Sequence, residues 1–207
     1  MMEYQLTLPP VLRRAETFFG DKEIVTRLPD RSLHRYTYAD FGRRSRAIAV
    51  ALQKLGLERG DRVATLMWNH AQHHEAYFGI PCGGFVLHTL NLRLHPNDIG
   101  YIANHAGDRV VIVDRSLLPL LEQFRDRTQI EHVFVVEDSY EELLATATPE
   151  EFRALDLDAQ LGRTLAEALE PERTFVEAVE RVLPREADAA VHLDRRLAGE
   201  HSRLRGL

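Results

Sequence analysis

The densest group of potential metal ligands in this 207-residue chain is a run of three histidines and one glutamate: His70, His73, His74 and Glu75. His70 and His74 are four residues apart, so on a helix they would share a face and could both reach one zinc ion. The order differs from the HExxH motif of zinc proteases, and the sequence suggests no distant third ligand. We therefore interpret the run as the first turns of a surface helix, with Asn69 as its N-cap.

Groups that are reactive in other proteins also occur at Cys82 and Asp114. Cys82 has apolar and glycine neighbours and no base nearby, so we interpret it as a small buried thiol at a helix end. The pair Gly83 and Gly84 is too short to cradle a phosphate, and it favours close packing of that helix end on the next strand. Asp114 follows an apolar run; it either lines a crevice at the carboxyl edge of a sheet or caps a helix that starts near Leu117.

The supply of lysine and the net charge limit the chemistry and the partners of the chain. Of 26 basic residues only Lys22 and Lys54 are lysines, so any step that needs a lysine must use one of these two. The 32 acidic residues give a formal net charge of −6, whereas a general nucleic-acid-binding surface needs a basic excess. We therefore expect no nucleic-acid partner.

Cysteine content and hydropathy indicate the compartment. A single cysteine excludes an internal disulfide framework and fits a reducing environment. The first residues lack the basic and apolar regions of a secretory signal, and no apolar run approaches the ~20 residues that span a bilayer. We expect a cytoplasmic protein without a transmembrane segment.

The elements that must position these groups alternate between strand and helix. This alternation predicts an α/β fold over residues 20 to about 146, with a mainly parallel sheet and helices on both faces. The expected strands are 22–27, 34–38, 62–67, 85–90, 109–114 and 132–137, and the expected helices are 38–55, 69–82, 96–106, 116–127 and 139–145.

Local signals mark several element ends. Thr37 and Asp40 have the spacing of a capping box before the first expected helix, and Gly56 suits the left-handed residue that ends it. Gly60-Asp61 predicts a turn before the next strand, and Pro96 predicts the first residue of a helix.

The composition changes near residue 160. From residue 160 to 207 the chain has eight Arg, nine Asp or Glu and one aromatic residue, Phe175. Such a segment is too poor in apolar residues to bury a core by itself. We predict two regions: a first domain over residues 1–158 and a charged, helical, weakly packed tail over residues 159–207.

From about Arg14 to Asp158 the chain resembles the opening part of fatty-acyl-CoA synthetases, which are AMP-binding, adenylate-forming enzymes. YTYADF (36–41) is similar to an early strand-to-helix motif of that family, and residues 55–114 resemble its second conserved stretch almost throughout. YEELLA (140–145) and DLD (156–158) fit the approach to the family's nucleotide loop. The histidine-rich NHAQHHEAYFG (69–79) is similar to synthetases that act on medium- or long-chain fatty acids.

The resemblance implies a reaction and its cofactors. Such enzymes use ATP and Mg²⁺ to convert a fatty acid to an acyl-adenylate and then transfer the acyl group to coenzyme A. A Ser/Thr/Gly-rich loop closed by Pro-Lys holds the phosphates; an aromatic-Gly-x-Thr-Glu segment, a ribose-binding aspartate and a lysine on a carboxyl-terminal lid come later.

None of these motifs occurs in the 207 residues, and residues 159–179 read AQLGRTLAEALEPERTFVEAV where the nucleotide loop is expected. Lys22 and Lys54 both fall in scaffold segments. We therefore assign no catalytic, cofactor-binding or metal-binding residue and expect the chain alone to bind no ATP, Mg²⁺ or coenzyme A. A further departure is His95, where the family usually has a Ser or Thr helix cap.

Three hypotheses about function remain open. The first is a truncated, inactive relative of fatty-acid–CoA ligases. The second is a non-catalytic module that docks on a partner, such as a full-length synthetase, through its charged tail. The third is one half of a split enzyme, which a separate chain completes.

Overall fold

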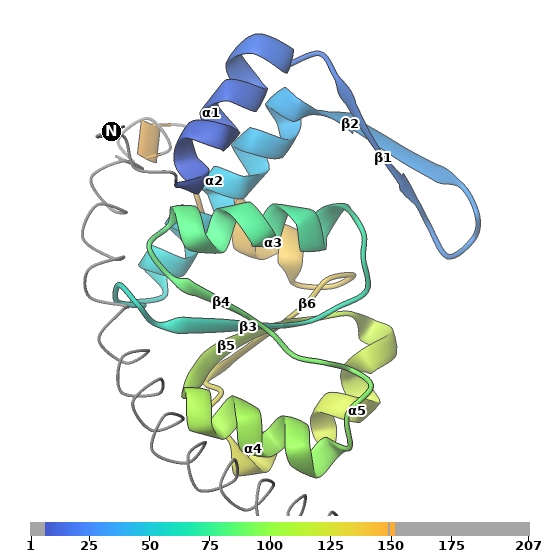
Figure 1. Ribbon diagram of the computed structural model, residues 1–207, viewed down its shortest axis with the longest axis vertical. Coiled ribbons are helices and arrows are strands. Elements are labelled where there is room, and N and C mark those ends of the chain that lie inside the picture. The colour runs from blue at the N-terminus through green and yellow to red at the C-terminus, as the bar shows by residue number, and fades with distance from the viewer. Residues whose placement is uncertain (1–6, 149, 152–207) are drawn as a thin grey trace, which may run out of the picture. The chain divides into compact units, whose positions relative to one another are not determined.

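The structure, a computed structural model, describes residues 7–148, 150 and 151. At the centre of this part of the chain, four parallel strands form a sheet in the order β4-β3-β5-β6 (Figure 1). The two middle strands are almost entirely buried, because helices cover both faces. This confirms the predicted α/β fold. The strands are β3 (Arg62–Leu66), β4 (Val86–Thr89), β5 (Asp108–Val113) and β6 (His132–Val135).

Connections between the strands run over opposite faces of the sheet. α3 (Ala71–Cys82) leads from β3 to β4 on one face, and α4 (Pro96–Ala106) leads from β4 to β5 on the other (Figure 1). α2 (Tyr38–Lys54) and the short α6 (Tyr140–Ala145) pack on the α3 side. The segment that follows β5 packs on the α4 side. The sheet is therefore doubly wound.

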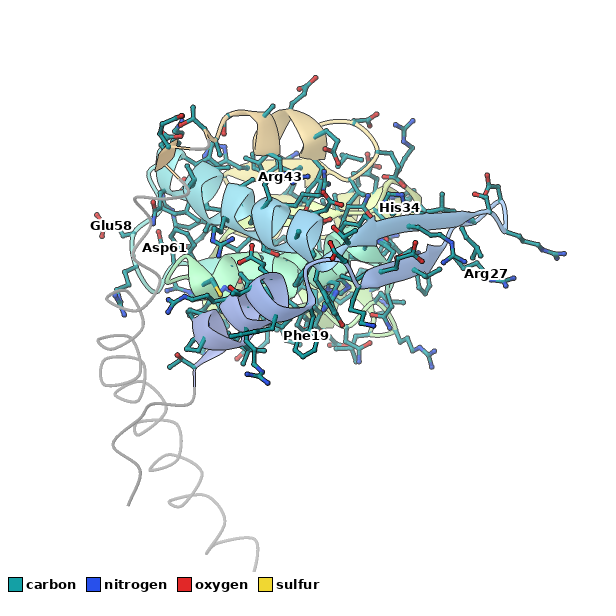
Figure 2. All side chains as sticks on the ribbon, turned by 90° about the horizontal axis from the view of Figure 1, so that it is seen from above. Phe19, Arg27, His34, Arg43, Glu58 and Asp61 are labelled. Atoms are coloured by element: carbon teal, nitrogen blue, oxygen red, sulfur yellow. The ribbon has the colours of Figure 1, made fainter. Side chains whose placement is uncertain are left out.

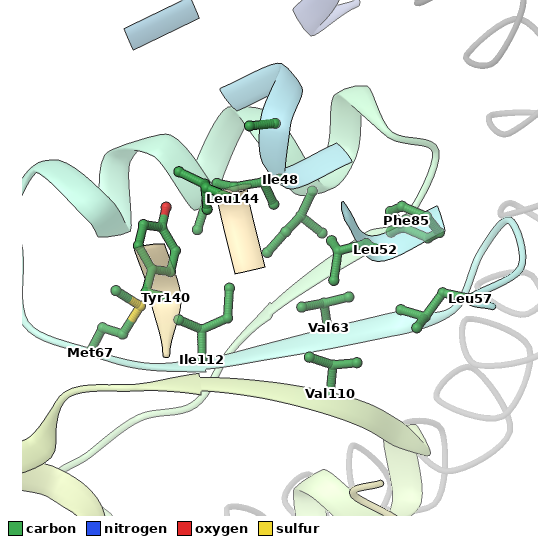
Figure 3. Packing of buried hydrophobic residues seen from close by; sticks show 13 residues of the cluster. Ile48, Leu52, Leu57, Val63, Met67, Phe85, Val110, Ile112, Tyr140 and Leu144 are labelled. Carbon is green, nitrogen blue, oxygen red and sulfur yellow. The ribbon is translucent and has the colours of Figure 1, made fainter. Parts of the chain in front are cut away.

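Apolar side chains fill the space between the sheet and each helical layer. Ile48 and Leu52, one helical turn apart on α2, pack with Val63 of β3, Ile112 of β5 and Tyr140 of α6 (Figure 3). The period of the apolar residues in α2 therefore indicated the buried face correctly. A second cluster on the opposite face includes Ile99, Ala103, Val111, Leu121 and Phe124.

The two strands predicted near the start of the chain form a separate antiparallel hairpin. β1 (Glu23–Arg27) pairs with β2 (Leu33–Thr37) and not with the parallel sheet. Figure 2 shows Arg27 and His34 on this hairpin, which projects beyond the helices.

One helix was not predicted. α1 (Leu8–Phe19) begins with Pro9 and Pro10, and a proline pair usually marks a break. In the first turn of a helix, however, the missing N–H costs nothing and the fixed φ is already helical. Leu12 then buries fully against α2 and α3.

The single helix predicted over residues 116–127 is wrong. This stretch is broken into a 3-10 turn, η1 (Arg115–Leu117), the short α5 (Leu118–Glu122) and a second 3-10 turn, η2 (Arg125–Arg127). Phe124 leaves helical geometry, with φ −134°, and its buried side chain contacts Gly100 of α4. Packing of one aromatic residue overrides the helical pattern here.

Most of the predicted element ends are confirmed. The Thr37 hydroxyl accepts from the Asp40 N–H at 3.1 Å, and the Asp40 carboxylate accepts from the Thr37 N–H at 3.1 Å, which completes the capping box. Gly60 adopts φ +84° in the predicted turn, and Gly56 adopts φ +78° after α2. His95 caps α4 through its ring, whose Nδ1 accepts from the Asn97 N–H at 3.2 Å.

The predicted tail at residues 159–207, and the boundary before it, lie outside the described residues. Within the part that is described, no helix combines the length and the apolar character needed to cross a membrane.

Candidate functional site

The carboxyl ends of β3 and β5 lie side by side in the middle of the sheet. The chain leaves β3 toward α3 on one face and leaves β5 toward α5 on the opposite face. In doubly wound sheets this divergence is where ligands bind, because the two connections leave a crevice between them. The loops at this edge carry Trp68, His70 and Asp114.

Asp114 joins the two loops. It is 3% exposed, and its Oδ2 accepts from the Trp68 backbone N–H at 2.6 Å while Oδ1 lies 2.8 Å from His70 Nε2. The Trp68 indole N–H donates to Ser116 Oγ at 3.1 Å. Asp114 is the residue before η1 but makes no side-chain cap there, so the capping alternative is wrong. Its carboxylate lies at the carboxyl edge of the sheet and holds the β3–α3 turn.

The predicted N-cap of α3 is also wrong, because His70 takes the place of Asn69. His70 has an extended backbone, with φ −153°, and its Nδ1 accepts from the His73 N–H at 3.4 Å. That acceptor role places the ring proton on Nε2, which faces the Asp114 carboxylate. The hydrogen bond to Asp114 therefore orients the His70 ring so that it caps α3, and His70 takes the role predicted for Asn69.

His73 is fixed in a definite tautomer as well. Its Nδ1 lies 3.1 Å from the Trp68 carbonyl oxygen, which can only accept, so Nδ1 carries the proton. Its Nε2, 3.1 Å from the Thr65 hydroxyl, is then the acceptor. Burial lowers the pKa of His73, which keeps the ring neutral. Both nitrogens of each ring are therefore hydrogen-bonded within the protein, and neither ring is available as a general base.

Glu75 faces a different part of the molecule. Its side chain is 1% exposed, and its two oxygens accept from Arg44 Nε at 2.7 Å and from the Tyr140 hydroxyl at 2.8 Å. Arg44 also binds Glu141 with both terminal nitrogens, at 2.9 and 2.6 Å. The network ties α2, α3 and α6 together. Sequence reasoning did not identify it, because its members lie up to 97 positions apart.

The four residues that looked like one metal site therefore point in separate directions. His74, the last of them, stacks on Phe41 of α2 with ring centroids 4.4 Å apart. Over residues 7–148, 150 and 151 no three His, Cys, Asp or Glu side chains are grouped to hold a metal ion. The spacing of four did place two histidines on one helix, but one of them is the cap and lies outside the regular turns.

Cys82 and the glycines after it have the predicted structural role. Cys82 ends α3 at 1% exposure, and burial raises the pKa of its thiol to about 12. A Cβ on Gly83 would lie 2.8 Å from the Phe85 ring and 3.1 Å from Ala49. The helix end thus packs closely on the next strand, and the thiol is not a nucleophile at neutral pH.

Comparison with known proteins identifies the family. The family model for AMP-binding enzymes matches residues 12–190. This match runs past residue 158, so the domain boundary predicted there stays a prediction. A long-chain-fatty-acid–CoA ligase of Thermus thermophilus is 49% identical over 138 residues, which are 67% of this chain and 26% of that protein.

Other relatives agree with this match. A medium-chain-fatty-acid–CoA ligase of Ectopseudomonas oleovorans is 36% identical over 123 residues, which are 59% of this chain and 22% of that protein. The crystal structure of the inhibitor-bound N-terminal domain of FACL13 from Mycobacterium tuberculosis superposes with a TM-score of 0.61 at 26% identity, and covers 68% of this chain and 36% of that one.

The chain spans about a quarter of the length of the curated relatives that it matches, 26% and 22% in these two cases. The matched family range nevertheless covers most of the chain, and the parallel sheet agrees with that of the solved acyl-CoA ligases. The chain belongs to the AMP-binding enzyme family and is related to its fatty-acid–CoA ligases.

Proposed function

We propose that these 207 residues form an amino-terminal scaffold of a fatty-acid–CoA ligase and do not by themselves make an acyl-adenylate. In the parent reaction a carboxylate oxygen of the fatty acid attacks the α-phosphorus of ATP, and pyrophosphate leaves. Coenzyme A then displaces AMP from the acyl group. The first step needs donors and cations that offset charge on the phosphates.

The observation that carries the proposal is the use of the two lysines. Lys54, the last residue of α2, donates to the Thr146 carbonyl oxygen at 2.6 Å and pairs with Glu151 at 2.8 Å. Its ammonium group is therefore used in contacts between α2 and the segment after α6. Lys22 is exposed directly before the hairpin, where its carbonyl oxygen accepts from the Tyr38 N–H. Neither lies at the carboxyl edge of the sheet.

The groups at that edge do not fit a nucleoside triphosphate. Asp114 and Glu137 both place a carboxylate at this edge, and that of Glu137 accepts from the Arg115 N–H at 2.8 Å. The Arg115 guanidinium pairs with Asp138. Phosphate oxygens would meet carboxylates here, and the sequence supplies no loop of backbone donors beside them.

Fatty-acid-dependent exchange of labelled pyrophosphate into ATP tests the proposal. Purified chain with Mg²⁺ and acids of several chain lengths should give the rate of a heat-killed control, because loss of even one oxyanion donor costs on the order of 100- to 1000-fold. Exchange that persists through purification would overturn the proposal.

A docking role on a homologous synthetase, or completion by a second chain, is the alternative. Exposed aromatic side chains favour it: Phe18 is 69% and Tyr101 is 70% exposed. The same assay separates the cases. Exchange that appears only when a second polypeptide is added supports the split enzyme, and a change in the rate of a full-length synthetase supports docking.

A further inference from the structure

A pocket of about 290 Å³ lies between α1, the start of α2 and α3. Neither of the lysines nor Asp114 is among the residues that line it. Its size is near the lower end of small-molecule sites, which are mostly apolar with a few polar groups. The walls are apolar or aromatic: Val11, Leu12, Ala15, Phe19, Tyr38, Phe41 and Phe78.

Besides the Tyr38 hydroxyl, two lining residues carry ionisable groups, Arg14 and His74. His74 stacks on Phe41 at 4.4 Å and meets Phe78 edge-on at 5.5 Å, and burial lowers its pKa. The ring is therefore neutral at neutral pH, so it forms part of the aromatic wall and adds no charge.

Arg14 supplies a cation at the rim. Its guanidinium carbon lies 5.4 and 5.8 Å from the ring centroids of Phe18 and Phe19, and Figure 2 shows Phe19 at the end of α1. Glu16, the nearest acid on α1, is already paired with Arg46. Within the described part of the chain Arg14 forms no ion pair, so its fork of donors is available to an anion.

We infer that this pocket binds a short aliphatic carboxylate, with the tail among the apolar walls and the carboxylate on Arg14. Removing the tail from water supplies much of the affinity. A planar carboxylate matches the guanidinium fork with two parallel hydrogen bonds, which a neutral or cationic head cannot form. The small volume favours a short tail over a long one.

This site does not depend on the proposed function. Its residues belong to the scaffold and would bind the carboxylate whether or not the chain forms an adenylate, and no bond is made or broken. The pyrophosphate exchange assay and a binding assay on this pocket can therefore fail separately.

Isothermal titration calorimetry of the whole 207-residue chain with octanoate tests the site, with octanamide as the uncharged probe of equal length. Octanoate should bind at least several-fold more tightly than octanamide. Arg14→Gln should weaken octanoate about five- to tenfold and leave octanamide unchanged, because only the charge-assisted bonds are lost. Arg13→Gln, one position away and outside the lining, is the matched control and should leave both unchanged.

A second variant tests the tail. Ala15→Phe should fill the pocket and abolish binding of both probes, with circular dichroism confirming that the fold is kept. Equal affinity for the two probes, an equal loss in Arg14→Gln and Arg13→Gln, or unchanged binding in a folded Ala15→Phe protein would each overturn the assignment.

Discussion

The charge of Glu75 is stabilised inside the molecule by named partners. A buried carboxylate is costly unless it is paired and hydrogen-bonded, and burial indeed raises the pKa of Glu75. Arg44 and the Tyr140 hydroxyl counter this, and each occupies one carboxylate oxygen. Arg44 also serves Glu141, whose side chain is 63% exposed. The Arg44 guanidinium thus pairs with one buried and one exposed carboxylate. Substitutions of Glu75 and of Glu141 can therefore be compared directly.

Glu75→Leu should lower the free energy of unfolding by about 2 kcal/mol, because the buried Tyr140 hydroxyl and the partly buried Arg44 guanidinium would both lose their acceptor. Glu141→Leu should cost less than about 1 kcal/mol, since this carboxylate is exposed and water screens its pairing with Arg44. Urea unfolding at neutral pH, with equal m-values for the three proteins, measures both. Equal losses in the two variants would show that burial does not set the strength of this network.

Two histidines make stability depend on pH in a predictable direction. Burial lowers the pKa of His73 and of His74 below 6.5. As the pH falls, these two side chains therefore become protonated in the unfolded chain before they do so in the folded protein. Their contribution to stability is present above the unfolded value and is lost as pH falls through about 6.5. The raised pKa values of Glu75 and Asp108 act in the opposite direction: their contribution increases as pH falls toward their unfolded values.

His74→Phe should therefore reduce the loss of stability between about pH 7 and about pH 5. Phenylalanine keeps the ring against Phe41 and removes the group that takes up the proton. Urea midpoints measured across this range give the slope. A slope as steep in the variant as in the parent protein would mean that His74 is not a source of the acid sensitivity.

At the scale of the elements, close packing of α2 on α3 depends on Gly79. A Cβ at this position would lie 2.6 Å from the Ser45 carbonyl oxygen and 2.8 Å from Ile48 Cβ. Both neighbours belong to the buried face of α2, so the helices could separate only by opening the apolar layer above the sheet.

Gly79→Ala should destabilise the protein by about 1–3 kcal/mol, although alanine is the better helix former by about 1 kcal/mol. The clash involves backbone and Cβ atoms, which cannot move aside as a long side chain can. Thermal unfolding followed by circular dichroism checks this. A variant as stable as the parent would show that the α2–α3 contact is looser than described.

The elements that sequence could predict are those with a local cause. The apolar period of α2, the capping box at Thr37 and Pro96 at the start of α4 each lie within a few residues of the feature that they determine. The break after α5 comes from Phe124 packing on Gly100, which is distant in sequence. The same holds for the site: the His70 cap depends on Asp114, 44 positions away.

At the scale of the whole molecule, the described part is a doubly wound scaffold. Polar groups at the carboxyl edge of its sheet are hydrogen-bonded to one another. Asp114, His70 and His73 hold the β3–α3 turn, and their nitrogens and oxygens are used within the protein. The family membership was predictable because many short motifs follow one another in the right order over residues 14 to 158. The pocket beside Arg14 was not predictable, because its lining residues come from three helices and one of these, α1, was not predicted.

Equilibrium dialysis of labelled ATP with Mg²⁺ against the purified 207-residue chain is the most direct test of the central claim, that these residues hold no nucleotide site. A full-length fatty-acid–CoA ligase in a parallel cell shows that the assay detects binding. We expect the same concentration of label on both sides of the membrane at every ATP concentration, because donors for the phosphates are missing. A saturable excess of label on the protein side, displaced by unlabelled ATP, would contradict the account.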